Sequence, residues 1–262
     1  MNLLFWNLYD KQNDRFIVDL LIENDIDTAI FAEYQKTDFL NVVSHLNGKY
    51  QLHDGVGGCT HITLLSKITN EVSVRREQDR YTLYSIACND ERYLVAGIHL
   101  PANPHSKADD RKNTIRDLVL DINEQEYLLK HDNTIVIGDF NASPYDSELI
   151  LKDHFNAVLF KDIIKRAEHV KYNKHIYKRF YNPMVHYISE TKQNYGSYFY
   201  GSGIDSLYWF CYDQVLVRRS LMDLLKDVKF CRMVNNSSLM TDTKPKKEIS
   251  DHLPLVVTFE RS

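Results

Sequence analysis

The stretch at residues 134–141 constrains the fold most, because it reads Thr-Ile-Val-Ile-Gly-Asp-Phe-Asn. Its first half is a short run of β-branched residues, which is typical of a strand buried on both faces. Gly138 ends the run, and Asp139 and Asn141 follow two residues apart. Side chains at i and i+2 of an extended backbone project to the same side. The sequence therefore predicts a carboxylate and an amide that point together from the end of a buried strand, where they suit a cleft better than a core.

Similar short apolar runs recur along the chain. In the first third of the chain, segments with helical periodicity lie between them. Apolar residues at helical spacing predict helices at 14–23, 37–46 and around 109–122, and shorter helices at 155–167 and 221–225. Residues 155–206 are the least regular part, and 235–247 is polar and predicted to be a loop. The predicted strands are 3–8, 28–33, 50–53, 62–66, 71–75, 82–88, 93–100, 134–139, 207–210, 212–217, 228–233 and 255–259.

This order of elements predicts one domain over residues 1–262, in the α/β (α+β) class. Helices alternate with strands at first, and strands then follow one another, which favours two mixed β-sheets packed face to face and flanked by helices. The expected architecture is thus a four-layered sandwich. With 44% hydrophobic residues the chain can bury a sizeable core, and it contains no repeat of fixed period and no Pro/Gly/Ser-rich linker.

Composition excludes several classes of protein. No apolar run reaches about 18 residues, so no membrane span is expected, and the N-terminus lacks the basic segment of a signal peptide. The formal net charge of −4 argues against a non-specific nucleic-acid binder that relies on bulk charge. The cysteines have no CxxC spacing, so we expect reduced thiols in a cytoplasmic protein, without a disulfide framework or zinc site. They are Cys59, Cys88, Cys211 and Cys231.

Polar residues of mixed type stand at the ends of the predicted strands. If the strands converge at one edge of a sandwich, these groups share one cleft. Carboxylates such as Glu33 and Asp251 suit Mg²⁺, an imidazole beside a carboxylate is the usual acid or base near neutral pH, and amides can bind a developing oxyanion. Taken singly, each residue also has a structural explanation, such as an Asx turn at Asp139 and Asn141. The residues are Asn7, Glu33, His99, Asp139, Asn141, Asp213, Asp251 and His252.

The order of these motifs resembles the endonuclease/exonuclease/phosphatase superfamily, in particular its DNase I-like and exonuclease III-type AP endonuclease-like members. The resemblance extends from Leu3 to Phe259, nearly the whole chain. It depends on the combination of Asn7, Glu33, His99, Gly138-Asp139-Phe140-Asn141, Tyr212-Asp213-Gln214-Val215 and Ser250-Asp251-His252.

The resemblance implies a metal site and an enzymatic activity. Glu33 would be the principal ligand of Mg²⁺, with Mn²⁺ as the alternative ion, and Asn7 and Asp251 would belong to the same site. The implied reaction is metal-assisted attack of water on a phosphate ester.

The resemblance also implies the catalytic roles. Asp139 would orient or activate the attacking water, and Asn141 would contact the scissile phosphate. His252, held by Asp213, would bind the phosphate or act as a base. His99 would protonate the leaving oxygen, as in DNase I-like members.

Some positions depart from the family pattern. The carboxylate partner expected for His99 is missing from residues 58–61, which leaves His61 as a substitute contact. Asn103 follows Pro101 only after an intervening alanine, so it is a weaker match to an asparagine of AP endonuclease-like members. The Pro-x-Trp-Cys-Asp-Arg pattern of inositol-polyphosphate phosphatases is absent, and Gln214 stands where arginine is common.

Two aromatic stretches bear on the substrate. Residues 171–181 carry Lys174, Lys178 and Arg179 among tyrosines, a composition that suits a nucleic-acid backbone and its bases but also a solvated helical face. Residues 195–203 are rich in tyrosine and glycine and suit either base stacking or ordinary packing.

Three hypotheses for function follow. The first is a Mg²⁺-dependent nuclease with nucleic acid as its substrate, the second is a phosphoesterase for a small or lipid phosphate, and the third is an inactive binding module. No marked apolar loop supports a lipid substrate. The sequence leaves open DNA against RNA, internal against terminal cleavage, one metal against two, and the oligomeric state.

Overall fold

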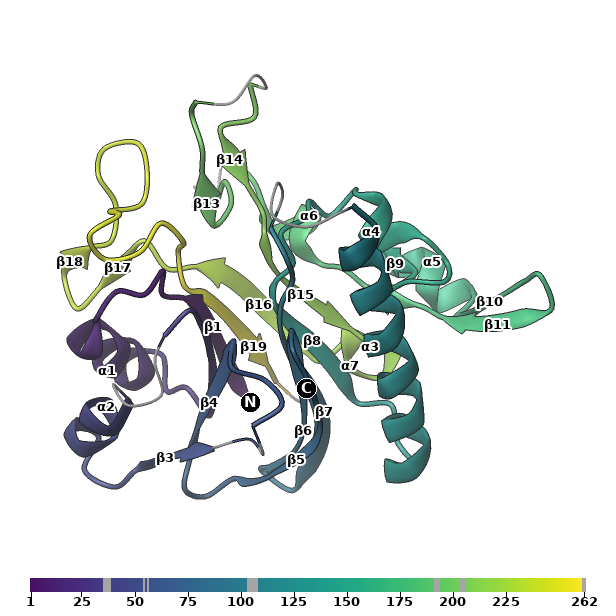
Figure 1. Cartoon of the computed structure of the whole chain (residues 1–262), viewed down its shortest axis with the longest axis horizontal. Helices are drawn as coiled ribbons and strands as arrows, with labels where there is room; N and C mark the ends of the chain where they lie inside the picture. The colour runs from purple at the N-terminus through teal and green to yellow at the C-terminus, as the bar shows by residue number, and fades with distance from the viewer. Residues whose placement is uncertain are drawn as a thin grey trace.

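The structure is a computed structural model that describes residues 1–34, 39–53, 55, 57–102, 108–190, 194–202 and 206–260. Two large sheets pack face to face, and helices cover their outer faces (Figure 1). Helices α1 (Asp14–Glu23) and α2 (Phe39–His45) lie on one sheet, and α3 (Ala108–Leu129) lies on the other. The predicted four-layered sandwich is confirmed.

The first sheet has six strands in the order β16-β19-β1-β2-β4-β3. Its centre is the parallel pair β1–β2, and β19 runs antiparallel to β1 on the other side. Both central strands are buried over nearly their whole length. The strands are β1 (Asn2–Asn7), β2 (Thr28–Ala32), β3 (Tyr50–His53), β4 (Ile62–Lys67), β16 (Leu225–Phe230) and β19 (Leu255–Phe259).

The second sheet has seven strands in the order β5-β6-β7-β8-β15-β12-β9. Its central strand β8 pairs in parallel with β7 and antiparallel with β15, so that His99 and Asp213 both lie beside Asp139 in the register. The strands are β5 (Glu71–Gln78), β6 (Tyr81–Cys88), β7 (Glu91–His99), β8 (Thr134–Asp139), β9 (Ala157–Val158), β12 (Phe180–Tyr181) and β15 (Asp213–Val217).

The alternation of side chains along β8 decides where its last residue points. Ile135 and Ile137 belong to the core between the two sheets, whereas Val136 belongs to a second core beneath α3. Asp139 has the same parity as Ile135 and Ile137, so it projects toward the first sheet. By the same reasoning Asp213 shares the inner face of β15 with Val215. The apolar pattern thus directs both carboxylates into the space between the sheets.

Gly138 allows β7 and β8 to approach each other immediately before Asp139. Its φ is +156°, and a Cβ atom added there would lie 2.0 Å from the carbonyl oxygen of Ile98. No side chain fits at that distance from backbone, so glycine is required here. The parallel register of β7 and β8, and with it the placing of His99 beside Asp139, depends on this contact.

The irregular part, residues 155–206, differs most from expectation. The helix predicted at 155–167 is wrong in its first half, because Asn156 adopts a φ of +48° and the chain enters β9 before α5 (Lys161–Arg166) begins. Residues 169–178 form the hairpin of β10 (His169–Tyr172) and β11 (His175–Lys178), not a helical face. Asn173 and Lys174 both have positive φ, as a two-residue type I′ turn requires.

The elements after residue 206 are shifted by a few residues from their predicted bounds. The predicted helix 221–225 is α7 (Arg219–Met222), because Leu225 already pairs with Phe259 in β16. The predicted loop 235–247 contains one short strand, β18 (Ser237–Ser238), paired with β17 (Met233–Val234). The remaining short elements are α4 (Ser147–Ile150), α6 (Met184–Tyr187), and the hairpin of β13 (Tyr198–Phe199) with β14 (Trp209–Phe210).

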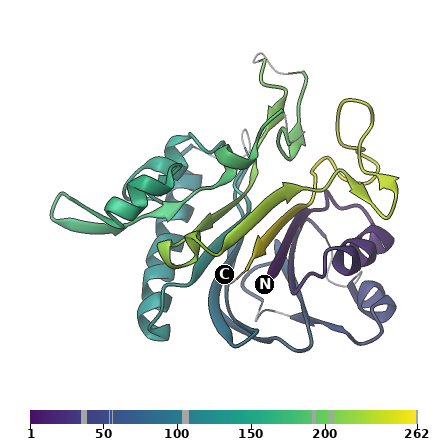
Figure 2. The same ribbon diagram turned by 180° about the vertical axis from the view of Figure 1, so that it is seen from behind.

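Two hairpins stand out from the sandwich in different directions. β13–β14 extends from the end at which β1 and β8 terminate, and β10–β11 extends sideways beyond α3 and α5 (Figures 1 and 2). All four cysteines are free and buried. Among the described residues, no helix has both the length and the apolar character that crossing a membrane would require.

The close approach at Gly138 can be tested with the substitution Gly138→Ala. The added methyl group must displace the backbone of β7, so we expect the free energy of unfolding to fall by about 3 kcal/mol or more. Urea denaturation measures this. Gly201→Ala is the control, because a Cβ at this exposed glycine would meet side-chain rings and no backbone, with Phe199 at 3.2 Å and Tyr208 at 3.7 Å. Equal stability of the two variants would contradict the assignment.

Candidate functional site

The side-chain amide of Asn7 joins the two sheets at the site. Its Nδ2 donates to Glu33 Oε1 at 3.1 Å and to Asp139 Oδ2 at 3.2 Å. Asn7 ends β1 and Glu33 follows β2, whereas Asp139 ends β8 in the other sheet. Because parallel strands β1 and β2 end at the same edge, three residues far apart in sequence meet across the interface between the sheets.

Glu33 is held in a backbone conformation that L-residues rarely adopt. Its φ is +52°, in the left-handed region. Its carbonyl accepts a hydrogen bond from the amide of Asp10 at 2.8 Å, and its side chain keeps 30% of its surface exposed. Strained backbone of this kind is found mainly at functional sites. Glu33 thus presents a partly open carboxylate at the end of an otherwise buried strand.

His99 finds its carboxylate partner in Glu33. The Nε2 atom of His99 lies 3.2 Å from Glu33 Oε1 and 3.9 Å from Asp139 Oδ2. Burial acts to lower the pKa of His99, but these two carboxylates outweigh it and raise the pKa above the ordinary value. The missing carboxylate in residues 58–61 is therefore supplied from another strand. The opposite nitrogen, Nδ1, is buried with no hydrogen-bond partner among the described residues.

His252 and Asp213 form a buried ion pair. Nδ1 of His252 lies 2.7 Å from Asp213 Oδ2, and its Nε2 lies 4.0 Å from Asp139 Oδ2. Burial alone would lower the pKa of His252, but the charge and hydrogen bond of Asp213 raise it well above the ordinary value. His252 is thus a cation at neutral pH, with Nε2–H directed toward the space beside Asp139.

Three further residues fix His252 from behind, and none of them was among the predicted site residues. The indole of Trp6 donates to the carbonyl of His252 at 3.0 Å. The Ser250 hydroxyl donates to the carbonyl of Asn7 at 2.7 Å and accepts from the amide of His252 at 3.0 Å. The ring of Tyr198 packs 4.9 Å from the imidazole. In the sequence, Ser250 is the first residue of the Ser-Asp-His motif and Tyr198 lies in the aromatic stretch 195–203, whereas Trp6 left no signal beyond its buried strand.

Asn141 shapes the turn after β8. Its backbone amide donates to Asp139 Oδ1 at 2.8 Å, which is the Asx-turn geometry expected as one alternative. Its φ is +45°, which asparagine tolerates, and its side-chain amide donates to the carbonyl of Leu100 at 2.8 Å. The turn leaves Asp139 Oδ2 directed at Asn7. Phosphate contact by Asn141 stays a prediction.

Two groups of acidic residues are candidates to hold a cation. Asp251 Oδ1 is buried without a hydrogen-bond partner among the described residues, and burial raises the pKa of this carboxyl, with a further increase from the charge of Glu33. A buried carboxylate oxygen without a hydrogen-bond partner, near a second carboxylate, suits a divalent cation. Asp139, Asp213 and His252 also lie within 4.8 Å of one another. In that triad Asp213 is fully buried and committed to His252, whereas Glu33 keeps 30% of its side chain exposed, so Glu33 and Asp251 fit a cation better.

His61 lies beside the site at the wall of a cavity. Its ring meets the His99 ring edge-on at 5.6 Å, and its Nε2 lies 3.8 Å from Asp79 Oδ1. The cavity has a volume of 590 Å³ and opens next to Glu33 and His99. The structure thus brings His61 to the predicted neighbourhood, in contact with the residue it was predicted to support.

The three predicted basic substrate contacts lie away from the site. Asn103 lies outside the described residues. Lys178 forms an ion pair at 2.9 Å with Glu126, and Glu126 is bonded to Thr134, at the opposite end of β8 from Asp139. Arg179 donates to a backbone carbonyl, and Lys174 lies in the exposed turn of the β10–β11 hairpin.

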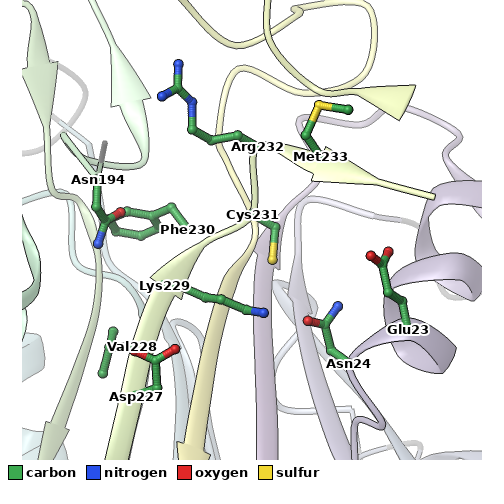
Figure 3. Close-up of a pocket in the computed structure, with 10 residues that line it drawn as sticks. All are labelled: Glu23, Asn24, Asn194, Asp227, Val228, Lys229, Phe230, Cys231, Arg232 and Met233. Carbon is green, nitrogen blue, oxygen red and sulfur yellow. The ribbon is translucent and has the colours of Figure 1, made fainter. Parts of the chain in front are cut away.

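A further cavity of 340 Å³ lies along β16, at the edge of the first sheet (Figure 3). None of the predicted site residues lines this cavity. Its lining mixes the acidic Glu23 and Asp227 with the basic Lys229 and Arg232, so that no charge of ligand is favoured (Figure 3).

Solved structures share this architecture over the whole chain. A humanised D. rerio TDP2 has a TM-score of 0.62 at 12% identity, with 100% of this chain and 99% of that chain covered. An endonuclease/exonuclease/phosphatase family protein from Bacteroides thetaiotaomicron has a TM-score of 0.60 at 12% identity, with 100% and 98% covered. The chain has the endonuclease/exonuclease/phosphatase fold. The fold that the sequence motifs implied is thus confirmed.

A third structure with this fold is a Neisseria 3′ phosphatase, NExo, bound to a product DNA hairpin. Its TM-score is 0.54 at 15% identity, and both chains are covered completely. No protein-family model matches the chain, and no curated protein matches its sequence. At 12–15% identity these likenesses establish the fold, and the chemistry must be argued from the site itself.

The buried pair of His252 and Asp213 predicts a measurable titration. In the native protein we expect the His252 imidazole to stay protonated through pH 8, above its ordinary pKa of about 6.5. Asp213→Asn removes the charge but not the burial, so the pKa should fall below the native value. Histidine NMR signals followed against pH measure this. Asp153→Asn, which removes a half-exposed carboxylate paired with Arg116, is the control. Native titration near pH 6.5 would contradict the assigned pair.

Proposed function

We propose that this chain is a Mg²⁺-dependent phosphodiesterase that hydrolyses DNA or RNA by metal-assisted attack of water, with Mn²⁺ as an alternative ion. The observation that carries the proposal is the convergence of Asn7, Glu33, Asp139, Asp213 and His252 at the strand ends, in two hydrogen-bonded groups that meet where His252 Nε2 lies 4.0 Å from Asp139 Oδ2. Carboxylates, an amide and an imidazolium together can hold a cation, position a water and bind a phosphate. Few other reactions use all three.

Glu33 and Asp251 would hold the cation, and Asn7 keeps Glu33 oriented toward it. The bound ion supplies positive charge to the phosphate oxygens. Glu33 suits this role because its carboxylate is partly open to solvent, and because the hydrogen bonds from His99 and Asn7 outweigh burial and lower its pKa. A carboxylate that stays ionised near neutral pH is the ligand that a hard divalent cation prefers.

The remaining residues act directly on the phosphate and the water. His252, charged through Asp213, donates from Nε2 to a phosphate oxygen, which favours phosphate binding over the role of a base. Asp139 lies between His252 and His99 and accepts the proton of the attacking water. His99, whose pKa is raised, carries the proton that the leaving oxygen needs. Asn141 contacts the scissile phosphate from the turn.

An aromatic hairpin next to His252 supports nucleic acid as the substrate. Tyr198 packs against His252 and stacks on Tyr212 at 5.5 Å. Beyond it Phe199 packs on Trp209 at 5.5 Å, and Tyr208 is 48% exposed. Successive aromatic rings that lead away from a phosphate site suit base stacking, which contributes about 1–3 kcal/mol per base. A D. rerio TDP2 structure contains a single-strand DNA product, and NExo contains a DNA hairpin.

A small phosphoester is the second candidate. The cavity beside Glu33 and His99 has a volume of 590 Å³, within the range that small ligands occupy. An inactive binding module fits less well, because the predicted catalytic residues are all present and converge. We propose a cytoplasmic location, since the four cysteines are free and buried.

The central role of Asp139 can be tested by hydrolysis. The purified protein should degrade single-stranded DNA, duplex DNA or RNA with Mg²⁺ and stop when EDTA is added. Asp139→Asn should lower the rate by about 10³-fold or more while the circular dichroism spectrum is unchanged. Asp153→Asn is the control at a distant carboxylate. Soluble phosphodiesters tested in parallel separate the two candidate substrates, and efficient cleavage by Asp139→Asn would refute the mechanism.

Metal binding can be located separately from activity. Titration of Mn²⁺ followed by electron paramagnetic resonance should show that Glu33→Gln weakens binding by about tenfold or more, because an ionised ligand is lost. Glu124→Gln, at an exposed position on α3, is the control. Asp213→Asn should bind nearly as the native protein does. If Asp213→Asn loses the ion and Glu33→Gln retains it, the cation belongs to the triad of Asp139, Asp213 and His252 instead.

A further inference from the structure

A groove lies at the far end of the second sheet, between the β10–β11 hairpin and the last turns of α3. Its volume is 690 Å³. The hairpin extends away from the body of the protein and away from the end that carries β13–β14 (Figures 1 and 2). Strand β8 begins with Thr134 at the end near the groove and finishes with Asp139 at the candidate active site. These two ends are separated by about 17 Å along the strand. The groove is therefore distinct from the candidate active site.

One face of the hairpin forms a wall of this groove. In the register of β10 and β11, His169 is opposite Lys178 and Lys171 is opposite Ile176, so these four side chains share a face. Ile176 is 70% exposed, and across the groove Tyr127 of α3 is 83% exposed. Among the described residues the hairpin has no third strand. A two-stranded sheet is marginally stable by itself, so exposed apolar side chains on it indicate a binding surface.

The floor of the groove is a buried ionic network with excess positive charge. Glu126 accepts from Arg218 Nε at 2.7 Å and from Lys178 Nζ at 2.9 Å, so one carboxylate faces two cations. The Arg218 guanidinium is buried and lies 3.8 Å over the Phe180 ring. Burial lowers the pKa of Arg218, and Glu126 only partly compensates. The network also fixes the hairpin rigidly to α3 through Lys178.

The rim adds further cations. Lys130, Lys171 and Lys174 are exposed, and none forms an ion pair with another described residue. His131 and His169 also line the groove or its wall, and Nε2 of His131 is buried without a hydrogen-bond partner in the described part of the chain. The lining carboxylates are Glu126, already paired, and Asp132. Of the charged residues here without an ion pair among the described residues, three are lysines and one is a carboxylate, so the groove favours a ligand with negative charge.

The geometry favours a peptide over nucleic acid as the occupant. A nucleic-acid track needs many free cations spaced along a backbone, but Lys178 and Arg179 are committed to Glu126 and to a backbone carbonyl, which leaves the three rim lysines among the described residues. A concave surface with one protruding aliphatic and one aromatic side chain instead suits the anchor residue of a peptide. The surrounding lysines complement acidic residues on either side of that anchor.

We propose that the groove formed by α3 and the β10–β11 hairpin binds an acidic peptide segment of a partner protein through one apolar anchor residue. The anchor packs between Ile176 and Tyr127, and the flanking carboxylates lie against Lys130 and Lys171. The site does not overlap the candidate active site, so binding there attaches the enzyme to a partner while its catalytic cleft stays free.

The probe for the test is a fluorescein-labelled twelve-residue peptide with one central leucine flanked by glutamates, followed by fluorescence anisotropy. The double variant Lys130→Glu/Lys171→Glu should weaken binding by about tenfold or more, since attraction becomes repulsion. Ile176→Ser should weaken it by a similar factor, because the anchor loses its apolar contact. A second probe carries serine in place of the central leucine. It should bind the native protein more weakly than the leucine probe does, whereas Ile176→Ser should bind the two probes equally.

Lys229→Glu is the matched control, because it reverses the charge of an exposed lysine on β16 of the other sheet. It should bind the probe as the native protein does, and thermal unfolding should show that all variants remain folded. Hydrolysis of nucleic acid should be unchanged by Lys130→Glu/Lys171→Glu. Equal binding by the double variant and the control would overturn the proposal. A twelve-nucleotide single strand provides a second test. If it displaces the peptide and binds the double variant more weakly than the native protein, the groove is a nucleic-acid surface and the proposal is overturned.

Discussion

The apolar contact between the two sheets is the constraint on which the site depends. Burial of Ile135, Ile137 and Val215 against the first sheet fixes the faces of β8 and β15, and a shift of one residue in either strand would turn every side chain to the opposite face. Asp139 and Asp213 continue these apolar faces by two residues. Their direction is therefore set by hydrophobic packing along the strands, and the site itself need supply only the final hydrogen bonds.

The hydrogen bonds at the strand ends convert that packing into a defined electrostatic arrangement. Asn7 contacts carboxylates from both sheets, and it is neutral, so it brings Glu33 and Asp139 together without cancelling their charge. Two histidines then lie near Asp139, each with a partner carboxylate of its own. The result is an alternation of negative and positive groups in a largely buried space. A phosphate ester and a cation can enter such an arrangement because each finds the complementary charge in place.

The two hairpins place the two proposed binding surfaces at opposite ends of β8. β13–β14 contacts His252 directly through Tyr198 and belongs to the catalytic end. β10–β11 is tied through Lys178 to Glu126 at the other end of β8. The same central strand thus connects a surface that suits a substrate with one that suits a partner. Because β8 is buried throughout, the distance between the two surfaces is fixed.

The sequence by itself determined the central strands and most of the site. The β-branched run ending in Gly138 and Asp139 was sufficient to predict a buried strand with polar residues at its end, because hydrophobic periodicity is a local property of the chain. Only the tertiary structure decided the partners: Glu33 for His99, Trp6 and Ser250 behind His252, and Glu126 for Lys178. Lys178 and Arg179 were predicted to track nucleic acid because charge and aromatic content are visible in sequence. Contacts between residues tens of positions apart depend on strand order and register, which no local pattern contains.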